Sequence, residues 1–87
     1  MNFFVYILKC SDGTYYTGCT NNIKRRVKQH NASKIGAHYT KLRRPVILRY
    51  FEEFQTLSEG RKREAALKRL TRAQKENLVR SNDIISP

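Results

Sequence analysis

The sequence predicts a single α+β domain, in which a small three-stranded antiparallel sheet is flanked by three helices in the order β-β-α-β-α-α. The chain has 87 residues, which is room for one modest core. Apolar, β-branched and aromatic segments around a turn predict a hairpin, and two helix-capping sequences follow in the second half. A sheet with helices packed against it is the arrangement such a pattern favours. We expect one domain over residues 1–82 and a frayed tail over 83–87.

Three segments have the composition of strands. Residues 3–10 (FFVYILKC) and 14–18 (TYYTG) are joined by the turn sequence Ser11-Asp12-Gly13. A third strand is expected over residues 46–51 (VILRYF), directly after Pro45. The first two strands should therefore form a hairpin, with the third added later in the chain.

The length of the hairpin loop decides where the two central tyrosines point. A two-residue loop would place Tyr6 and Tyr16 on opposite faces of the sheet. A three-residue loop, with Gly13 in the left-handed conformation, pairs Cys10 with Thr14 and puts both tyrosines on one face. We predict the three-residue loop.

A first helix is expected from about residue 23 to 31. Its buried face is indicated by Ile23, Val27 and His30, which recur at i, i+4 and i+7. Arg26 precedes His30 by four residues, so these two side chains should be neighbours. Three residues ahead of the helix can cap it: Thr20, Asn21 and Asn22.

The rest of the chain reads as a loop and two helices. Residues 32–45 lack periodicity and predict a long basic loop with room for short helical turns. A capping box at Thr56-Leu57-Ser58-Glu59 predicts a helix over about 57–69. A second capping box, Thr71-Arg72-Ala73-Gln74, predicts a helix that ends near Arg80.

The charge of the chain points to a polyanionic partner. Eighteen Lys and Arg face seven Asp and Glu, for a formal net charge of +11. DNA, RNA and an anionic membrane would all attract such a surface, and the nine aromatic residues favour nucleic acid. Helix-turn-helix and zinc-finger patterns are missing, so we expect recognition of DNA structure, ends or single strands rather than of a specific sequence.

The sequence also favours a cytoplasmic protein without a membrane span. No stretch approaches the roughly 18 apolar residues that a span needs, and the apolar start reads as a strand rather than a signal peptide. Cys10 and Cys19 make no metal-ligand pattern. They could form a disulfide across the hairpin or remain free thiols. Because nothing points to export, we expect free thiols in the cytoplasm.

Five residue positions stand out as candidates for chemistry. Taken singly, each is common in cores or on solvated helices. Together, Phe4-Val5-Tyr6, Tyr16-Thr17-Gly18, Arg26, His30 and Glu64 resemble the motifs of the GIY-YIG nuclease family. The resemblance runs from about residue 2 to 80 and is greatest to small single-domain bacterial members, many of uncharacterised function.

Other segments share this likeness, and three positions depart from the family pattern. Gly36-Ala37-His38-Tyr39-Thr40 and Arg43-Arg44-Pro45-Val46 look like the same subgroup. Phe4 replaces the first motif's Gly, Thr17 replaces the second motif's Ile, and Cys19 replaces a basic residue that some members carry.

The resemblance implies divalent-metal-dependent hydrolysis of DNA phosphodiester bonds, with DNA repair or recombination as the setting. Tyr6 or Tyr16 would take the proton of the attacking water, and which of them acts stays open. Arg26 suits the non-bridging phosphate oxygens, because its guanidinium is planar and always charged. Glu64 would hold one Mg²⁺ or Mn²⁺ ion, since magnesium commonly binds through only one or two carboxylates. His30 would orient a tyrosine or protonate the leaving oxygen.

A basic surface should hold the nucleic acid by salt-sensitive phosphate contacts. Tyr39 would stack on a base or simply pack, and Lys68 would touch phosphate or pair with Glu64. The binding candidates are Lys24, Arg25, Lys28, Tyr39, Lys41, Arg43, Arg44 and Lys68. The rival interpretation is a non-catalytic nucleic-acid-binding module. A third option is a protein-interaction domain attached to a repair complex.

Overall fold

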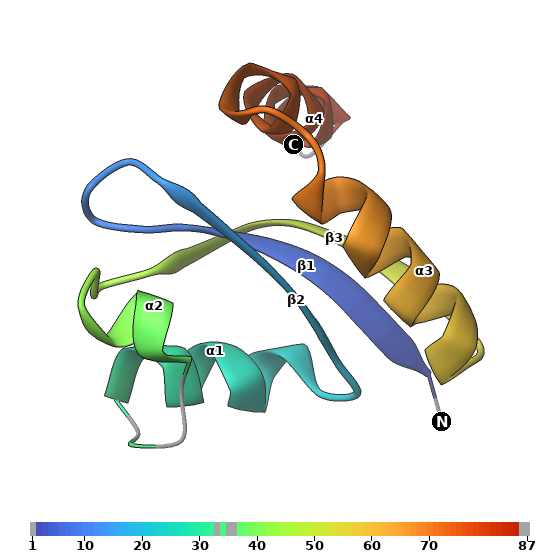
Figure 1. Cartoon of the computed structure of the whole chain (residues 1–87), viewed down its shortest axis with the longest axis horizontal. Coiled ribbons are helices and arrows are strands. Elements are labelled where there is room, and N and C mark those ends of the chain that lie inside the picture. The colour runs from blue at the N-terminus through green and yellow to red at the C-terminus, as the bar shows by residue number, and fades with distance from the viewer. Residues whose placement is uncertain (1, 33, 35–36, 86–87) are drawn as a thin grey trace.

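The structure is a computed structural model that describes residues 2–32, 34 and 37–85, with only the backbone of residues 82–85. The elements in chain order are β1 (Phe3–Lys9), β2 (Tyr15–Thr20), α1 (Ile23–Ala32), α2 (His38–Lys41), β3 (Ile47–Phe54), α3 (Leu57–Lys68) and α4 (Arg72–Ile85) (Figure 1). This confirms the α+β class. The element added to the expected order is α2, a single turn within the segment expected as a loop.

The sheet has the strand order β2-β1-β3, and both pairings are antiparallel. Helices α1 and α2 cover one face, and α3 and α4 cover the other (Figure 1). On the central strand, Val5 and Ile7 pack with Leu67 of α3, whereas Tyr6 and Leu8 belong to the cluster on the α1 side. Because β1 is covered on both faces, its sequence is continuously apolar rather than alternating.

The register of the hairpin is the one predicted. Tyr6 lies opposite Gly18 and Leu8 opposite Tyr16. The backbone N–H of Cys10 donates to the carbonyl of Thr14 at 2.8 Å, and Gly13 has a φ of +84°. A three-residue loop with a left-handed glycine therefore places both tyrosines on the face that α1 covers.

Gly18 makes room for the first of these tyrosines. A Cβ atom at this position would lie 2.6 Å from Cζ of Tyr6, well inside van der Waals contact. The phenol can lie across β2 only because its neighbour has no side chain. The glycine of the second motif thus fixes the position of the tyrosine of the first.

The predicted caps form at the start of three helices. The side chain of Asn22 accepts from the backbone N–H of Arg25 at 3.0 Å, and Thr56 accepts from that of Glu59 at 3.2 Å. Thr71 and Gln74 form a reciprocal capping box, with distances of 3.2 and 2.8 Å. Local sequence therefore determines where these helices begin.

Three predicted ends are wrong. Strand β2 continues to Thr20 instead of ending at residue 18. Strand β3 continues to Phe54 instead of ending at residue 51, because Glu52 is paired with Arg63 at 2.9 Å on an edge strand that tolerates charge. Helix α4 continues to Ile85 instead of ending near Arg80, since Ser, Asn and Asp are weak helix formers but not breakers. Residues 83–85 are helical where a frayed tail was expected, and 86–87 lie outside the described residues.

Cys10 and Cys19 are free thiols, as expected. Cys10 belongs to the cluster on the α1 side and Cys19 packs against the cluster on the α3 side, so the sheet separates them. Among the described residues, no helix is long and apolar enough to cross a membrane.

The contact between Gly18 and Tyr6 predicts a large effect of adding one methyl group. Gly18→Ala should lower the free energy of unfolding by about 2 kcal/mol or more, because a β-sheet backbone and a buried ring cannot both move aside. Gly60→Ala is the matched control. Its added Cβ would lie 3.2 Å from Sγ of Cys19, and its helix propensity improves by about 1 kcal/mol. Urea denaturation measures both variants, and equal losses would contradict the account.

Candidate active site

Tyr6, His30 and Thr40 form a buried chain of hydrogen bonds, and each is at most 1% exposed. Tyr6 Oη lies 2.8 Å from Nε2 of His30, and Nδ1 of His30 lies 2.8 Å from Oγ1 of Thr40. The Thr40 hydroxyl donates its only proton to the carbonyl of Ala37 at 2.8 Å, so it accepts from His30. His30 therefore carries its proton on Nδ1, and its Nε2 accepts the proton of Tyr6.

The electrostatic environment keeps both members of the central hydrogen bond neutral. Burial raises the pKa of Tyr6 to about 12, and this outweighs the hydrogen bond and charge of Arg26, which act to lower it. Burial lowers the pKa of His30 to about 4, with further lowering by the charges of Arg26 and Arg44. A tyrosine can take a proton from water when nearby cations lower its pKa, but burial instead raises the pKa of Tyr6.

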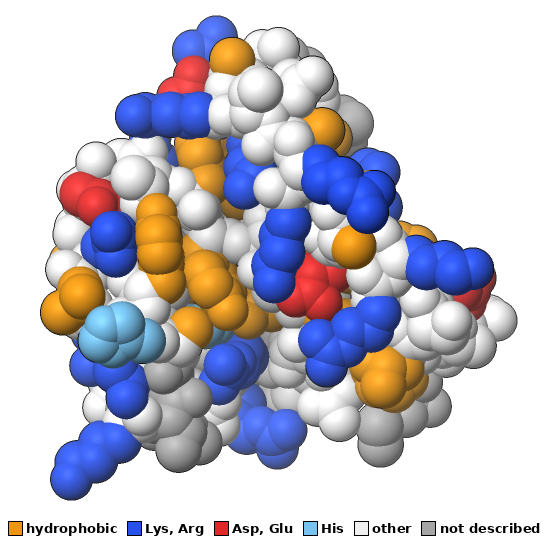
Figure 2. Space-filling model, viewed as in Figure 1, with side chains coloured by type: hydrophobic (Ala, Val, Ile, Leu, Met, Phe, Trp, Pro, Cys, Tyr) orange, Lys and Arg blue, Asp and Glu red, His pale blue; other side chains and the backbone are white. Residues whose placement is uncertain are grey.

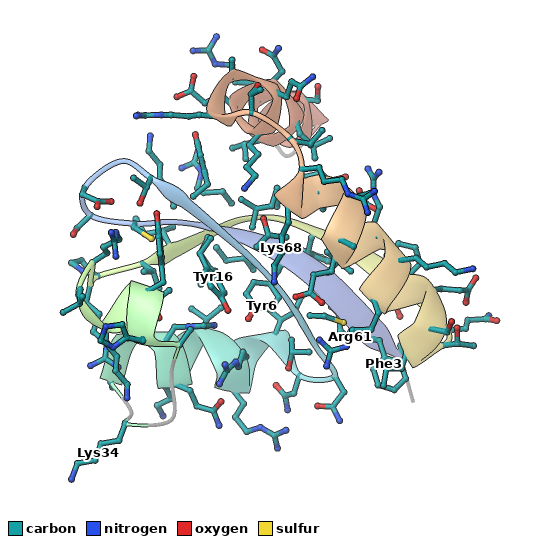
Figure 3. The ribbon with its side chains drawn as sticks, in the orientation of Figure 1. Phe3, Tyr6, Tyr16, Lys34, Arg61 and Lys68 are labelled. Carbon is teal, nitrogen blue, oxygen red and sulfur yellow. The ribbon has the colours of Figure 1, made fainter. Side chains whose placement is uncertain are left out.

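Tyr16 lies on the outer side of this buried chain. Its ring centroid is 5.1 Å from that of His30, 5.9 Å from that of Tyr39 and 6.5 Å from that of Tyr6. Figure 3 shows Tyr6 and Tyr16 side by side beneath β2. Unlike Tyr6, Tyr16 is only half-buried, so it is the one of these two tyrosines that solvent can reach.

Glu64 reaches the site from α3, on the opposite face of the sheet. It is 8% exposed, with Oε1 3.1 Å from Arg61 and Oε2 3.1 Å from Lys68. Figure 3 shows Arg61 and Lys68 extending from α3 towards β2. The charge of Glu64 acts on the pKa of Tyr6, so the carboxylate is within electrostatic reach of the phenol. The close approach of Gly60 to Cys19 brings α3 down onto β2 one turn before Glu64.

The donor set fits a hard divalent cation better than zinc. In the described part of the chain, no group of three or more His, Cys, Asp or Glu side chains gathers as a metal site. Glu64 therefore offers a single carboxylate, which suits Mg²⁺ or Mn²⁺ with most of its waters retained. A structural zinc site needs four protein ligands. Both oxygens of Glu64 already attract cationic groups from the solvent side, so positive charge is accommodated there.

The predicted nucleic-acid-binding residues divide into two groups. Lys24, Arg25 and Lys28 are exposed on α1, and Figure 2 shows Lys and Arg side chains spread over the face that it draws. Arg43 and Arg44 instead hold the protein together. Arg43 pairs with Asp12 at 3.0 Å and lies 3.8 Å from the ring of Tyr39, and Arg44 donates to the carbonyl of His30 at 2.6 Å. Lys41 is half-buried on α2, and Lys68 pairs with Glu64.

Sequence reasoning missed two residues of this site. Thr40, which fixes the tautomer of His30, falls in a segment without periodicity, although the segment was noted as part of the family likeness. Arg61 is the second, although its spacing of three residues from Glu64 on a helix is the signal for an ion pair.

The buried neutral His30 predicts a loss of stability in mild acid. Its pKa is about 4 in the folded protein and about 6.5 in the unfolded chain, so unfolding takes up a proton between these values. The free energy of unfolding should fall by roughly 2–3 kcal/mol as the pH drops from about 6.5 to about 4. Urea denaturation at several pH values measures this slope. His30→Gln should lose that part of the slope, and an unchanged pH dependence in the variant would contradict the assignment.

Comparisons with known proteins agree with this geometry. Residues 2–77 match the family model described as the GIY-YIG catalytic domain. The chain is 52% identical over 79 residues to a UPF0213 protein of Syntrophus aciditrophicus, covering 91% of each chain. It is 51% identical over 80 residues to the UPF0213 protein DP2720 of Desulfotalea psychrophila, covering 92% of this chain and 73% of that one.

A solved structure shows the same architecture. The solution structure of the protein EF2693 from E. faecalis is 45% identical and superposes with a TM-score of 0.64. The superposition covers 97% of this chain and 88% of that one. The chain therefore belongs to the GIY-YIG family of nucleases, and it is similar to the UPF0213 proteins.

Proposed function

We propose that this chain is a divalent-metal-dependent nuclease that hydrolyses phosphodiester bonds of DNA, directed by DNA structure or ends, in DNA repair or recombination. The proposal is supported by the packing of Tyr16 against the neutral Tyr6–His30 pair, and by a buried carboxylate, Glu64, whose charge acts on the pKa of Tyr6. The free thiols of Cys10 and Cys19 suit the reducing cytoplasm, where DNA is found in bacteria.

Tyr16 is the better placed of the two tyrosines to take the proton of the attacking water. A general base must reach that water, and Tyr6 is 1% exposed with its proton committed to His30. Tyr16 is accessible and packs on the edge of His30 at 5.1 Å between centroids. Tyr6 and His30 then act as positioning residues that hold the Tyr16 ring.

The remaining roles follow from charge. Arg26 binds the non-bridging oxygens of the phosphate through its guanidinium. Glu64 would hold a divalent cation, which when bound supplies Lewis-acid stabilisation of the phosphate and leaving oxygen. In the free protein, Arg61 and Lys68 form ion pairs with Glu64. When a divalent cation binds the carboxylate, these two side chains would become available to bind phosphate. DNA binding on Lys24, Arg25 and Lys28 supplies the sequence-independent part of the affinity.

A cleavage screen tests the proposal. With Mg²⁺ or Mn²⁺, the chain should cleave branched or single-stranded DNA. Glu64→Gln, Arg26→Ala and Tyr16→Phe should each reduce the rate by about 100-fold to 10,000-fold, while DNA binding persists. Tyr6→Phe should instead lower the free energy of unfolding by about 1–3 kcal/mol, because His30 Nε2 loses its buried partner.

Two outcomes of that screen would contradict the proposal. Cleavage at the wild-type rate by Glu64→Gln and Arg26→Ala would remove the mechanism. Tight, salt-sensitive DNA binding without cleavage under any divalent metal would favour the rival, a non-catalytic nucleic-acid-binding module.

The ion pairs on Glu64 predict a competition with the metal. Lys68→Gln and Arg61→Gln should each tighten Mn²⁺ binding about two- to tenfold, because the metal no longer displaces a cation from the carboxylate. Isothermal titration calorimetry measures the affinity. Lys62→Gln is the matched control, since it removes the same charge from an exposed position of α3 that is not paired with Glu64. Equal changes in Lys62→Gln and Lys68→Gln would show that only net charge matters.

A further inference from the structure

A groove on the α1 side of the sheet takes no part in the chemistry proposed above. Its volume is about 580 Å³, and its walls include Phe4, Val27, Leu48 and Phe51. Phe51 is the cross-strand neighbour of Tyr6, and Phe4 precedes Tyr6 by two residues on the same strand. The groove therefore adjoins the candidate active site along one face of the sheet.

The aromatic wall of this groove is unusually open. Phe51 is 49% exposed, although it lies in the middle of β3. Its ring meets that of Phe4 edge-on, with centroids 6.1 Å apart and planes at 67°. Phe4 is half-buried, so the wall combines one exposed and one half-buried aromatic ring. Exposed apolar side chains normally occur singly, and an apolar hollow lined by an aromatic pair is a feature of binding sites.

The rim of the groove indicates the chemistry of its ligand. Asn22 and Lys24 line the groove and also border a second hollow of about 560 Å³, which they share with Arg25 and Lys28. An apolar aromatic slot is thus continuous with a basic surface. Single-stranded nucleic acids have both complementary parts, a flat base that stacks on an aromatic ring and a phosphate on either side of it.

Charge argues against a second copy of this chain as the occupant. The chain carries a formal net charge of +11, and the rim of the groove is itself basic. Two copies meeting at this surface would bring like charges together as the apolar walls close.

We propose that this groove binds an unpaired DNA base, which stacks against Phe51 while the adjacent phosphates contact Lys24, Arg25 and Lys28. The inference rests on the proposed function only in taking DNA as the ligand. On α1, helical spacing puts Lys24 and Lys28 on one flank and Arg26 on the other. A helix is roughly 10 Å across with its side chains. The base in the groove therefore belongs to a nucleotide near the cleaved phosphate, not to the cleaved nucleotide itself.

Oligonucleotides with and without bases test this inference directly. Fluorescence anisotropy in EDTA compares a single-stranded oligonucleotide with a strand of equal length that carries abasic sites, so that cleavage plays no part. The wild-type chain should bind the base-bearing strand about tenfold more tightly, the scale of one base–aromatic stack. Phe51→Leu keeps an apolar side chain but should weaken only the base-bearing complex. The ratio of the affinities for the base-bearing and the abasic strand should therefore fall close to one.

Matched variants separate stacking from charge and from folding. Phe54→Leu makes the same change on the opposite face of β3, where Phe54 packs against the α3 side of the core, and should leave the ratio unchanged. Lys24→Gln should weaken both complexes alike. Urea denaturation shows whether Phe51→Leu is folded, and Phe51→Ala repeats the test with a smaller side chain.

The proposal would be overturned if the wild-type chain bound the base-bearing and abasic strands with nearly equal affinity. It would also be overturned if the ratio of the two affinities were unchanged in both folded Phe51 variants. Failure of the proposed nuclease activity is distinguishable. In that case the metal-dependent cleavage screen would be negative while the ratio and its loss in Phe51→Leu remain.

Discussion

The packing of the Tyr6 phenol across Gly18 is the contact on which the rest of the site depends. Because β2 has no side chain at this point, the ring crosses the strand and its hydroxyl reaches His30 at 2.8 Å. His30 is in turn held by Thr40 of α2. The glycine therefore allows one buried series of hydrogen bonds to connect the β1–β2 hairpin with α1 and α2. Tyr16 packs against the outer side of this series.

Charge is arranged in layers around the hydrogen-bonded series of Tyr6, His30 and Thr40. At its centre, burial keeps Tyr6 and His30 neutral, with pKa values of about 12 and about 4. Beside it lies the carboxylate of Glu64, which is held between Arg61 and Lys68. Outside lies the basic surface of a chain whose formal net charge is +11. Under the proposed function, an anionic DNA backbone would be attracted to the outer layer, and the Glu64 carboxylate would hold a divalent cation.

Local signals made much of this predictable from the sequence. The Asp12-Gly13 turn and the spacing of Tyr6 and Tyr16 gave the correct register, and the capping box at Thr71 marked the start of α4. The bond between His30 and Thr40 was not predictable, because it crosses an aperiodic segment that packs back onto α1. The burial of Glu64 could not be predicted from the sequence either. It depends on how closely Gly60 lets α3 approach β2, which is a tertiary contact.

The central claim is that α3, β2 and α1 meet around one divalent cation next to the hairpin tyrosines. Line broadening by Mn²⁺ in the amide NMR spectrum of the labelled chain measures this most directly, because broadening falls off steeply with distance from the ion. The account predicts early broadening at Glu64, Gly18 and Arg26, and its disappearance in Glu64→Gln. Broadening centred on Asp12 or Glu52, with Glu64 unaffected, would contradict it.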